Sequence, residues 1–206
     1  MPEVEEVTEG EPEAAVVENA RRKVRAGLDM GAGKGNLVLG VDTEVVLDGQ
    51  LLGKASDESE ARERLESLSG RTHEVLSGVV VATTPGASRL QFVPREGTKS
   101  SLGAEAPPSV PAPRPEERSG VARSQVTFRE LPERLINAYL AFGEWRDRAG
   151  AYAVQGLGSS LVERVEGDLS NVIGLPVNLL LELVPELLPC AGESEPRGMF
   201  GSQSQV

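Results

Sequence analysis

The stretch LVLGVDTEVVLDGQLLGK, residues 37–54, decides the fold that the sequence predicts. An apolar run ends at Val41, the acid and hydroxyl pair Asp42-Thr43 follows, and a second apolar run ends in an Asp48-Gly49 turn. This pattern predicts two strands that bracket a carboxylate. A buried carboxylate is costly unless it meets a cation, a donor or water, so this placement favours a catalytic or metal-binding acid.

The segments on either side predict alternating helices and strands. Apolar residues at helical spacing predict a helix over 12–27, and a capping box predicts another over 57–70. The valine-rich run 71–82 predicts a strand that is buried on both faces. It holds the only histidine, His73, which we interpret as a hydrogen-bonded strand residue rather than a zinc ligand.

The second half of the chain is interrupted by prolines. Seven of the 14 prolines lie between residues 85 and 115, so we expect a Pro-rich disordered insertion at about 84–122. The elements expected after it are a strand at 125–129, a helix from 132 to 142, paired strands at 151–154 and 160–165, and a last helix from 176 to about 188. Residues 1–190 are therefore expected to form a single domain, followed by a disordered tail at 191–206.

The composition argues against several classes of protein. The formal net charge of -11 disfavours nonspecific nucleic-acid binding, which needs clustered Lys and Arg. The longest apolar run near the C-terminus, at 177–188, is too short and too polar to span a membrane. A single cysteine, Cys190, and the lack of a charged-then-apolar leader favour a reducing cytoplasm.

Charged and amide side chains gather at the expected strand ends and glycine-rich turns. They are the carboxylates Asp42, Asp147, Glu163, Glu166 and Asp168, the cations Lys54, Arg71 and Arg148, and the amides Gln155 and Asn171. Carboxylates, a divalent metal and Lys or Arg are the groups needed for attack on a phosphorus centre. Solvated surface charge is the alternative explanation for each residue taken alone.

Several long motifs resemble the Maf proteins, nucleoside triphosphate pyrophosphatases related in fold to the inosine triphosphatase group. They are VDTEVVLDGQLLGK at 41–54, ARERLESLSGRTHEVLSGVVV at 61–81, VTFREL at 126–131, GEWRDRAGAYAVQG at 143–156 and VERVEGDLSNVIGLP at 162–176. The resemblance implies an α/β fold with an elongated mixed β-sheet flanked by helices. It also implies metal-assisted hydrolysis between the α and β phosphates, which yields a nucleoside monophosphate and pyrophosphate.

The matching motifs carry the family's site residues onto this chain. Asp42 looks like the proton acceptor, and Thr43 and Gln155 look like the base-specificity positions of the dTTP and UTP branch. Lys54 and Arg148 look like phosphate-contacting cations, although the family usually has lysine where Arg148 stands, and arginine changes the donor geometry. The implied cofactor is Mg²⁺ or Mn²⁺ and the implied partner is a nucleoside triphosphate, without nucleic acid or membrane; a homodimer is left open.

The N-terminus departs from the family's pattern. The family begins with a strand and a Ser/Arg-rich phosphate loop, whereas PEVEE at 2–6 resembles its later Pro-Asp-Val-Asp-Glu segment. Glu6, together with Asp42, is therefore expected to be a metal carboxylate. A start placed too far downstream and a shortened protein both explain the difference. Two hypotheses follow: an active pyrophosphatase of dTTP, UTP and modified pyrimidine nucleotides, or a weakened or inactive Maf-like module that binds nucleotide or a cell-division partner.

Overall fold

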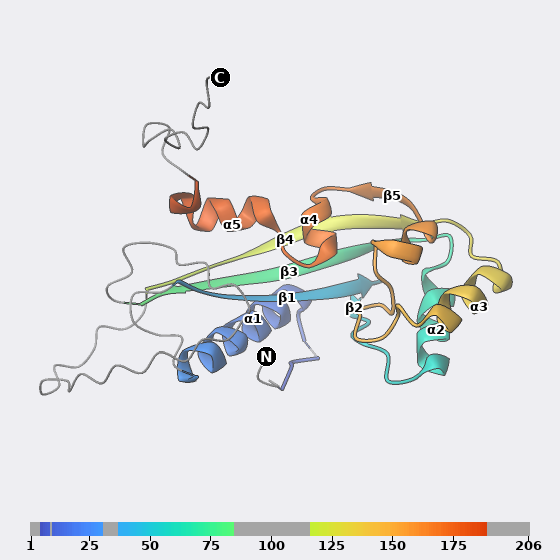
Figure 1. Ribbon diagram of the computed structural model, residues 1–206, viewed down its shortest axis with the longest axis horizontal. Helices are drawn as coiled ribbons and strands as arrows, with labels where there is room; N and C mark the ends of the chain where they lie inside the picture. Colours follow the sequence, from blue (N-terminus) through green and yellow to red (C-terminus); the bar gives the residue numbers. More distant parts are fainter. Residues whose placement is uncertain (1–4, 9, 31–36, 85–115, 189–206) are drawn as a thin grey trace, which may run out of the picture.

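A five-stranded sheet in the order β2-β1-β3-β4-β5 forms the centre of the molecule, and its three long strands run side by side along the longest axis (Figure 1). The computed structural model describes residues 5–8, 10–30, 37–84 and 116–188. The strands are β1 (Leu37–Leu47), β2 (Gln50–Leu51), β3 (Thr72–Thr83), β4 (Glu116–Phe128) and β5 (Val162–Glu166). The helices are α1 (Pro12–Asp29), α2 (Glu58–Leu68), α3 (Glu133–Phe142), α4 (Leu169–Ile173) and α5 (Val177–Leu183), with short 3-10 helices η1 (Gly156–Ser160) and η2 (Pro185–Leu187). The predicted α/β architecture, an elongated sheet flanked by helices, is confirmed.

Every described strand pairing is antiparallel, whereas a mixed sheet was expected. The reason lies in the connections. The segment that carries β2 and α2 lies beyond the end of the sheet at which β1 finishes, so β3 starts at that end and runs back alongside β1 (Figure 1). A parallel neighbour would need a crossover that returns along the length of the sheet.

Asp42 lies within one continuous strand, which corrects the prediction that two strands bracket it. β1 runs through this position and pairs with β3 along its length, with Asp42 opposite Gly78. The second strand, β2, has only two residues and pairs with β1 at Val46 and Leu47. The edge of β1 beside Asp42 therefore has no strand partner among the described residues.

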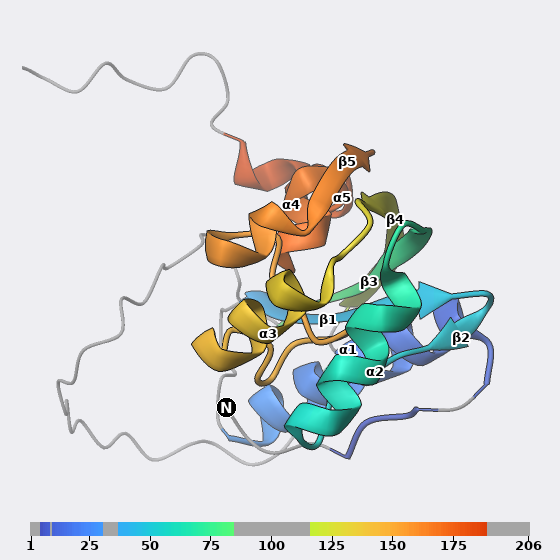
Figure 2. The same ribbon diagram turned by 90° about the vertical axis from the view of Figure 1, so that its right-hand side faces the viewer.

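The two faces of the sheet are covered by different helices (Figure 2). Val80 and Ala82 of β3 pack against α1, while the alternate residues Val79 and Val81 pack against α5 and the segment that follows it. This period-2 alternation is the pattern expected of a strand that is buried on both faces. The predicted valine-rich strand is thereby confirmed.

Two glycines allow α1 to lie directly on the sheet. A Cβ atom at Gly40 would lie 2.2 Å from the carbonyl oxygen of Ala20, and one at Gly78 would lie 2.3 Å from that of Val16. Any larger residue would therefore force the helix away from the sheet. α1 also continues to Asp29, past Gly27, where the sequence predicted its end.

The largest core cluster lies at the end of the sheet where α2 and α3 pack together. It includes the aromatic residues Phe128, Tyr139 and Tyr152 and buries His73 beside them. The Nε2 atom of His73 lies 2.7 Å from the hydroxyl oxygen of Tyr152, and its ring packs edge-on against Phe128 and Tyr152. The prediction of a hydrogen-bonded strand histidine is confirmed.

β4 begins at Glu116, so the end of the insertion expected at 84–122 is strand rather than loop. Backbone pairing with β3 extends to the pair Thr83 and Glu116, and it forms although the side chains of 116–125 are mostly polar. The rest of that insertion, residues 85–115, lies outside the described residues, as does the tail expected at 191–206.

The C-terminal segments differ from the sequence prediction in three places. Residues 151–154 are not a strand, because Ala151 adopts φ +59°, in the left-handed region, and β5 pairs with β4 instead. Residues 169–173 form α4, which the sequence did not predict. The last α-helix ends at Leu183 and is followed by η2. None of the helices that the structure describes is both long and apolar enough to pass through a bilayer.

Candidate active site

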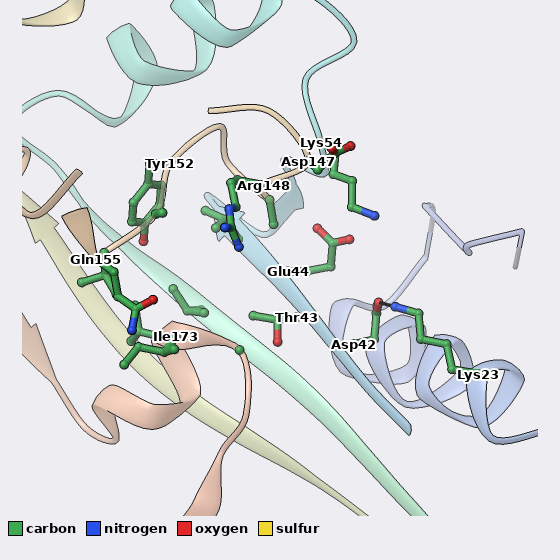
Figure 3. Close-up of a pocket in the computed structure, with 17 residues that line it drawn as sticks. Lys23, Asp42, Thr43, Glu44, Lys54, Asp147, Arg148, Tyr152, Gln155 and Ile173 are labelled. Atoms are coloured by element: carbon green, nitrogen blue, oxygen red, sulfur yellow. Dashed lines mark hydrogen bonds and ion pairs between the residues drawn. The ribbon is translucent and has the colours of Figure 1, made fainter. Parts of the chain in front are cut away.

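A cavity of about 310 Å³ opens at the edge of β1 (Figure 3). Its walls come from β1, from α1, from the loop that follows α3 and from the end of α4. Its charged and polar lining residues are Lys23, Asp42, Thr43, Glu44, Lys54, Asp147, Arg148, Tyr152 and Gln155. Five of the six site residues that the family resemblance carries over, Asp42, Thr43, Lys54, Arg148 and Gln155, therefore line one cavity. The sixth, Glu6, contacts both lysines that line it, Lys23 and Lys54.

Backbone bonds between two distant loops set Arg148 beside Lys54. The amide of Gly150 donates a 2.8 Å hydrogen bond to the carbonyl oxygen of Gly53, and Lys54 forms an isolated antiparallel bridge with Ala149. Gly150 adopts φ +64°, a conformation that suits glycine. Both cationic side chains extend toward the cavity (Figure 3).

Asp42 is only 4% exposed, and two residues of α1 satisfy its carboxylate. The amide of Asn19 donates a 3.0 Å hydrogen bond to Oδ2, and the ammonium of Lys23 donates to Oδ1. Asn19 and Lys23 are four residues apart and so lie on the same side of the helix. The close packing of α1 on the sheet thus makes the burial of Asp42 tolerable.

Lys23 connects the two predicted metal carboxylates. Its Nζ atom bonds to Asp42 and lies 3.1 Å from Oε1 of Glu6, whose Oε2 lies 3.4 Å from Nζ of Lys54. Burial alone would lower the pKa of Lys23, but hydrogen bonding and attraction to Asp42 and Glu6 raise it. Burial alone would raise the pKa of Glu6, but Lys23 and Lys54 lower it. Glu6 and Asp42 therefore contact the same ammonium group, that of Lys23. In the described part of the chain, no group of three or more His, Cys, Asp or Glu residues is placed to hold a metal.

Asn19 also fixes the short segment that carries Glu6. Its side-chain oxygen accepts a 2.6 Å hydrogen bond from the amide of Val7, and its side-chain nitrogen donates at 3.1 Å to the carbonyl oxygen of Val7. The same side chain thus orders the backbone next to Glu6 and the carboxylate of Asp42.

Glu44 is the acidic residue of the cavity that the sequence interpretation did not single out. It lies two residues beyond Asp42 on β1, on the same face, and is 7% exposed. Its Oε2 atom is buried and has no hydrogen-bond partner among the described residues. Burial and then the negative charges of Asp42 and Glu6 raise the pKa of Glu44 to about 7. The alternation of side chains along a strand was the available signal, because it places a second acid beside the first.

The other end of the cavity is neutral. Thr43 extends from β1, with its hydroxyl oxygen 2.7 Å from that of Ser77, while Gln155 approaches from the loop before η1 (Figure 3). Tyr152 and Ile173 lie beside Gln155. Burial raises the pKa of Tyr152, so it stays a neutral phenol. The cavity therefore has a charged end and an uncharged hydrogen-bonding end.

The sheet, its flanking helices and the divided cavity define an α/β protein with a charged cleft at a strand edge. The chain belongs to the Maf family, because the family's model, described as Maf-like protein, matches residues 1–187.

Relatives from bacteria and archaea support this assignment. The chain is 40% identical over 202 residues to a protein of Anaeromyxobacter sp. (strain Fw109-5), which covers 98% of this chain and 82% of the relative. It is 40% identical over 175 residues to a protein of Desulfitobacterium hafniense (strain Y51), and this match covers 83% of this chain and 66% of the relative. It is 38% identical over 147 residues to a protein of Pyrococcus furiosus, and this match covers 71% of this chain and 62% of the relative. All three relatives are named dTTP/UTP pyrophosphatase, and the match spans less than two thirds of the length of the last two.

Proposed function

We propose that the protein hydrolyses the nucleoside triphosphates dTTP and UTP to the monophosphate and pyrophosphate. The observation that carries this proposal is the cavity itself, which joins lysine, arginine and carboxylate groups at one end with Thr43 and Gln155 at the other. The names of the relatives support the same substrates. Modified pyrimidine nucleotides belong to the same proposal.

The phosphate groups are proposed to bind at the charged end. Lys54 has a single ion pair in the described part of the chain, a 3.4 Å contact with Glu6, and Arg148 has none there. Both cations can therefore turn to phosphate oxygens. A guanidinium can donate two parallel hydrogen bonds to one phosphate, which favours Arg148 as an orienting group.

Asp42 is proposed to accept the proton of the attacking water. A carboxylate offers about four lone-pair sites, and Asn19 and Lys23 use two of those on Asp42. The remaining sites can face a water in the cavity, while Asn19 and Lys23 hold the carboxylate in a fixed orientation. This fixed orientation is what a general base needs, because proton transfer requires hydrogen-bond contact with the water.

Thr43 and Gln155 are proposed to recognise the base. An amide side chain has both a donor and an acceptor, and uracil and thymine present both along one edge. The hydroxyl of Thr43 is held by Ser77, so its position does not depend on the ligand.

A divalent cation, Mg²⁺ or Mn²⁺, is the proposed cofactor. When bound, it would offset phosphate charge and make a bound water more acidic. Glu6 and Asp42 are the proposed ligands, and their carboxylate oxygens are the hard donors that such ions prefer. The buried Oε2 atom of Glu44, which lacks a partner within the described residues, indicates that this end of the cavity can accept a cation.

The cellular setting is part of the same proposal. A net charge of -11 and a single cysteine support a cytoplasmic protein without nucleic-acid or membrane partners. A homodimer stays a prediction, which size-exclusion chromatography with light scattering would measure.

Pyrophosphate release tests the proposal. Purified protein with Mg²⁺ or Mn²⁺ should release pyrophosphate from dTTP and UTP faster than from GTP, and Asp42→Asn should abolish the release. Asp48→Asn is a matched control, because Asp48 is exposed at the end of the same strand and pairs with Arg71 outside the cavity. A folded protein that binds nucleotide in a calorimeter without releasing pyrophosphate would contradict the proposal and favour a binding module.

A further inference from the structure

The carboxylate of Glu144 holds the backbone that follows Gln155. Its Oε1 atom accepts a 3.1 Å hydrogen bond from the amide of Leu157, and its Oε2 atom accepts a 3.0 Å hydrogen bond from the amide of Gly158. Both amides lie in the first turn of η1, and Gln155 immediately precedes this turn. A Cβ atom at Gly156 would lie 2.5 Å from Oε1 of Glu144, so the loop and the carboxylate are in close contact.

The turn that carries Glu144 is itself fixed to the core. It follows α3 directly, and the C-cap residue of that helix, Gly143, adopts φ +82° and bonds back to the helix backbone. Trp145 is only 4% exposed, and its indole nitrogen donates a 3.2 Å hydrogen bond to the carbonyl oxygen of Leu140. The residues on both sides of Glu144 are thus held by the end of α3.

A side chain of α3 holds the other end of the same loop. The hydroxyl oxygen of Tyr139 accepts a 3.1 Å hydrogen bond from the amide of Ala153. Gln155 lies between this attachment and that of Glu144, and its side chain makes no hydrogen bond that caps η1. Its backbone is therefore fixed on both sides, while its side chain lines the cavity (Figure 3).

We propose that Glu144 is a positioning residue for base selection, which acts through the placement of Gln155. This inference rests on the proposed function, in which Gln155 recognises the base, and it adds a residue that is not among those lining the cavity. Uracil presents an acceptor where cytosine presents an amino donor, and an amide side chain has one group of each kind. If the loop could shift, Gln155 would adapt to either base, so selection requires that the loop stay in place.

Amide hydrogen exchange, measured by NMR without nucleotide, tests the attachment. Glu144→Gln keeps the shape of the side chain but replaces one acceptor oxygen with a donor nitrogen, so one of the two amides loses its acceptor. We expect the amide of Leu157 or of Gly158 to exchange about tenfold faster or more in this variant. The amide of Glu60, which bonds to Asp57 in α2, should not change. Unchanged exchange at both loop amides would overturn the inference.

Binding of nucleotide analogues tests the effect on selection. Calorimetry with the α,β-methylene analogues of UTP and CTP, which cannot be hydrolysed between the α and β phosphates, gives the ratio of the two Kd values. Glu144→Gln should lower the preference for the UTP analogue about fivefold. Adding Glu144→Gln to Gln155→Ala should cause no further loss, because Glu144 acts only through Gln155. An unchanged ratio in Glu144→Gln, or additive losses in the double variant, would contradict this role.

Asp57→Ala is the matched control. Asp57 also bonds to a backbone amide at the start of a helix, but it lies outside the cavity. Its removal should lower the Tm and leave the ratio of Kd values unchanged. If it changed the ratio as much as Glu144→Gln does, general loosening would explain both variants and the inference would fail.

The same measurements separate this inference from the proposed function. A wild type that prefers the UTP analogue but releases no pyrophosphate would overturn the proposed reaction alone, since the binding ratios still decide the role of Glu144. A wild type without a preference, or a ratio that Gln155→Ala leaves unchanged, would overturn base recognition by Gln155 and this inference together.

Discussion

The side-chain amide of Asn19 donates a 3.0 Å hydrogen bond to Asp42 and thereby joins α1 to the strand that lines the cavity. The same amide group makes two hydrogen bonds to the backbone of Val7, next to Glu6. One buried residue therefore orders two of the carboxylates that the proposed reaction uses. Removing it should affect activity more than stability alone explains.

Asn19→Ala tests this positioning role. It leaves the buried oxygen of Asp42 without a donor, so the free energy of unfolding should fall by about 1–3 kcal/mol. We also expect kcat for pyrophosphate release to fall at least tenfold at a temperature where the variant is fully folded. Asn137→Ala, at an exposed position where Asn137 accepts from Arg62, should change neither quantity. Unchanged kcat in a folded Asn19→Ala variant would show that Asn19 is structural only.

Gly78→Ala tests the close approach of α1 to the sheet. The added Cβ would lie 2.3 Å from a backbone oxygen of Val16, so the helix must move and the free energy of unfolding should fall by about 2 kcal/mol or more. Gly27→Ala is the matched control on the same helix. Its Cβ would meet only a side-chain methyl of Val38 at 3.3 Å, and the gain in helix propensity is about 1 kcal/mol. Urea unfolding measures both, and equal stabilities would contradict the tight packing.

His73 should make stability depend on pH. Burial lowers its pKa to about 4 from the ordinary value of 6.5, so between these values the unfolded chain binds a proton that the folded chain does not. The contribution of His73 to stability is therefore largest above pH 6.5 and falls as the pH drops toward 4. Because one pKa unit is worth about 1.4 kcal/mol, the loss is on the order of 3 kcal/mol.

His73→Gln removes the titrating group and keeps a partner for the hydroxyl of Tyr152. Urea unfolding of the two proteins at pH 7, 5.5 and 4.5 should show that the free energy of unfolding falls more steeply with decreasing pH in the wild type. The difference between the two slopes is the relevant quantity, because other acidic groups affect both proteins alike. Parallel slopes would mean that His73 does not stay neutral in the folded protein.

Gln155→Ala should relax base selectivity without unfolding the protein. Gln155 is exposed and lines the cavity, so its removal creates no buried void. We expect kcat/KM for UTP to fall about tenfold, because the variant loses one to two hydrogen bonds to the base. The kcat/KM for CTP should change much less. Gln125→Ala, at an exposed position on β4, is the control and should leave the ratio of UTP to CTP unchanged. An unchanged ratio in Gln155→Ala would remove Gln155 from base recognition.

The sequence predicted best the elements whose signals are local. Asp57 accepts a hydrogen bond from the amide of Glu60, so the predicted N-cap of α2 is present. The carboxylate of Glu60 bonds to Ser56 rather than to the amide of Asp57. The valine run of β3 is a second local signal, because β-branched residues favour a strand. β4 was predicted too short, since its first residues are held by backbone pairing with β3, which leaves no mark in composition.

The sequence predicted several residues of the candidate site but not the contacts between them. Asp42, Lys54 and Arg148 were identified by their motifs, and the structure brings them to one cavity. Lys23 was missed, because a basic residue near the end of a helix is explained equally well by the helix dipole. Only the packing of α1 on the sheet shows that Lys23 reaches Asp42. Glu44 was passed over because β1 was divided at Asp42, so the alternation across it was not followed.

The two glycines under α1 also determine where the helix can sit along its own axis. Gly40 on β1 faces Ala20, and Gly78 on the neighbouring strand β3 faces Val16. Ala20 and Val16 are about one turn apart on α1. A slide of one turn, about 5.4 Å, would bring Val16 or Val24 over Gly40 in place of Ala20 and would carry Lys23 away from Asp42. The helix therefore docks in a single register. The placement of the charged groups in the cavity is set, in this protein, by two residues that have no side chain.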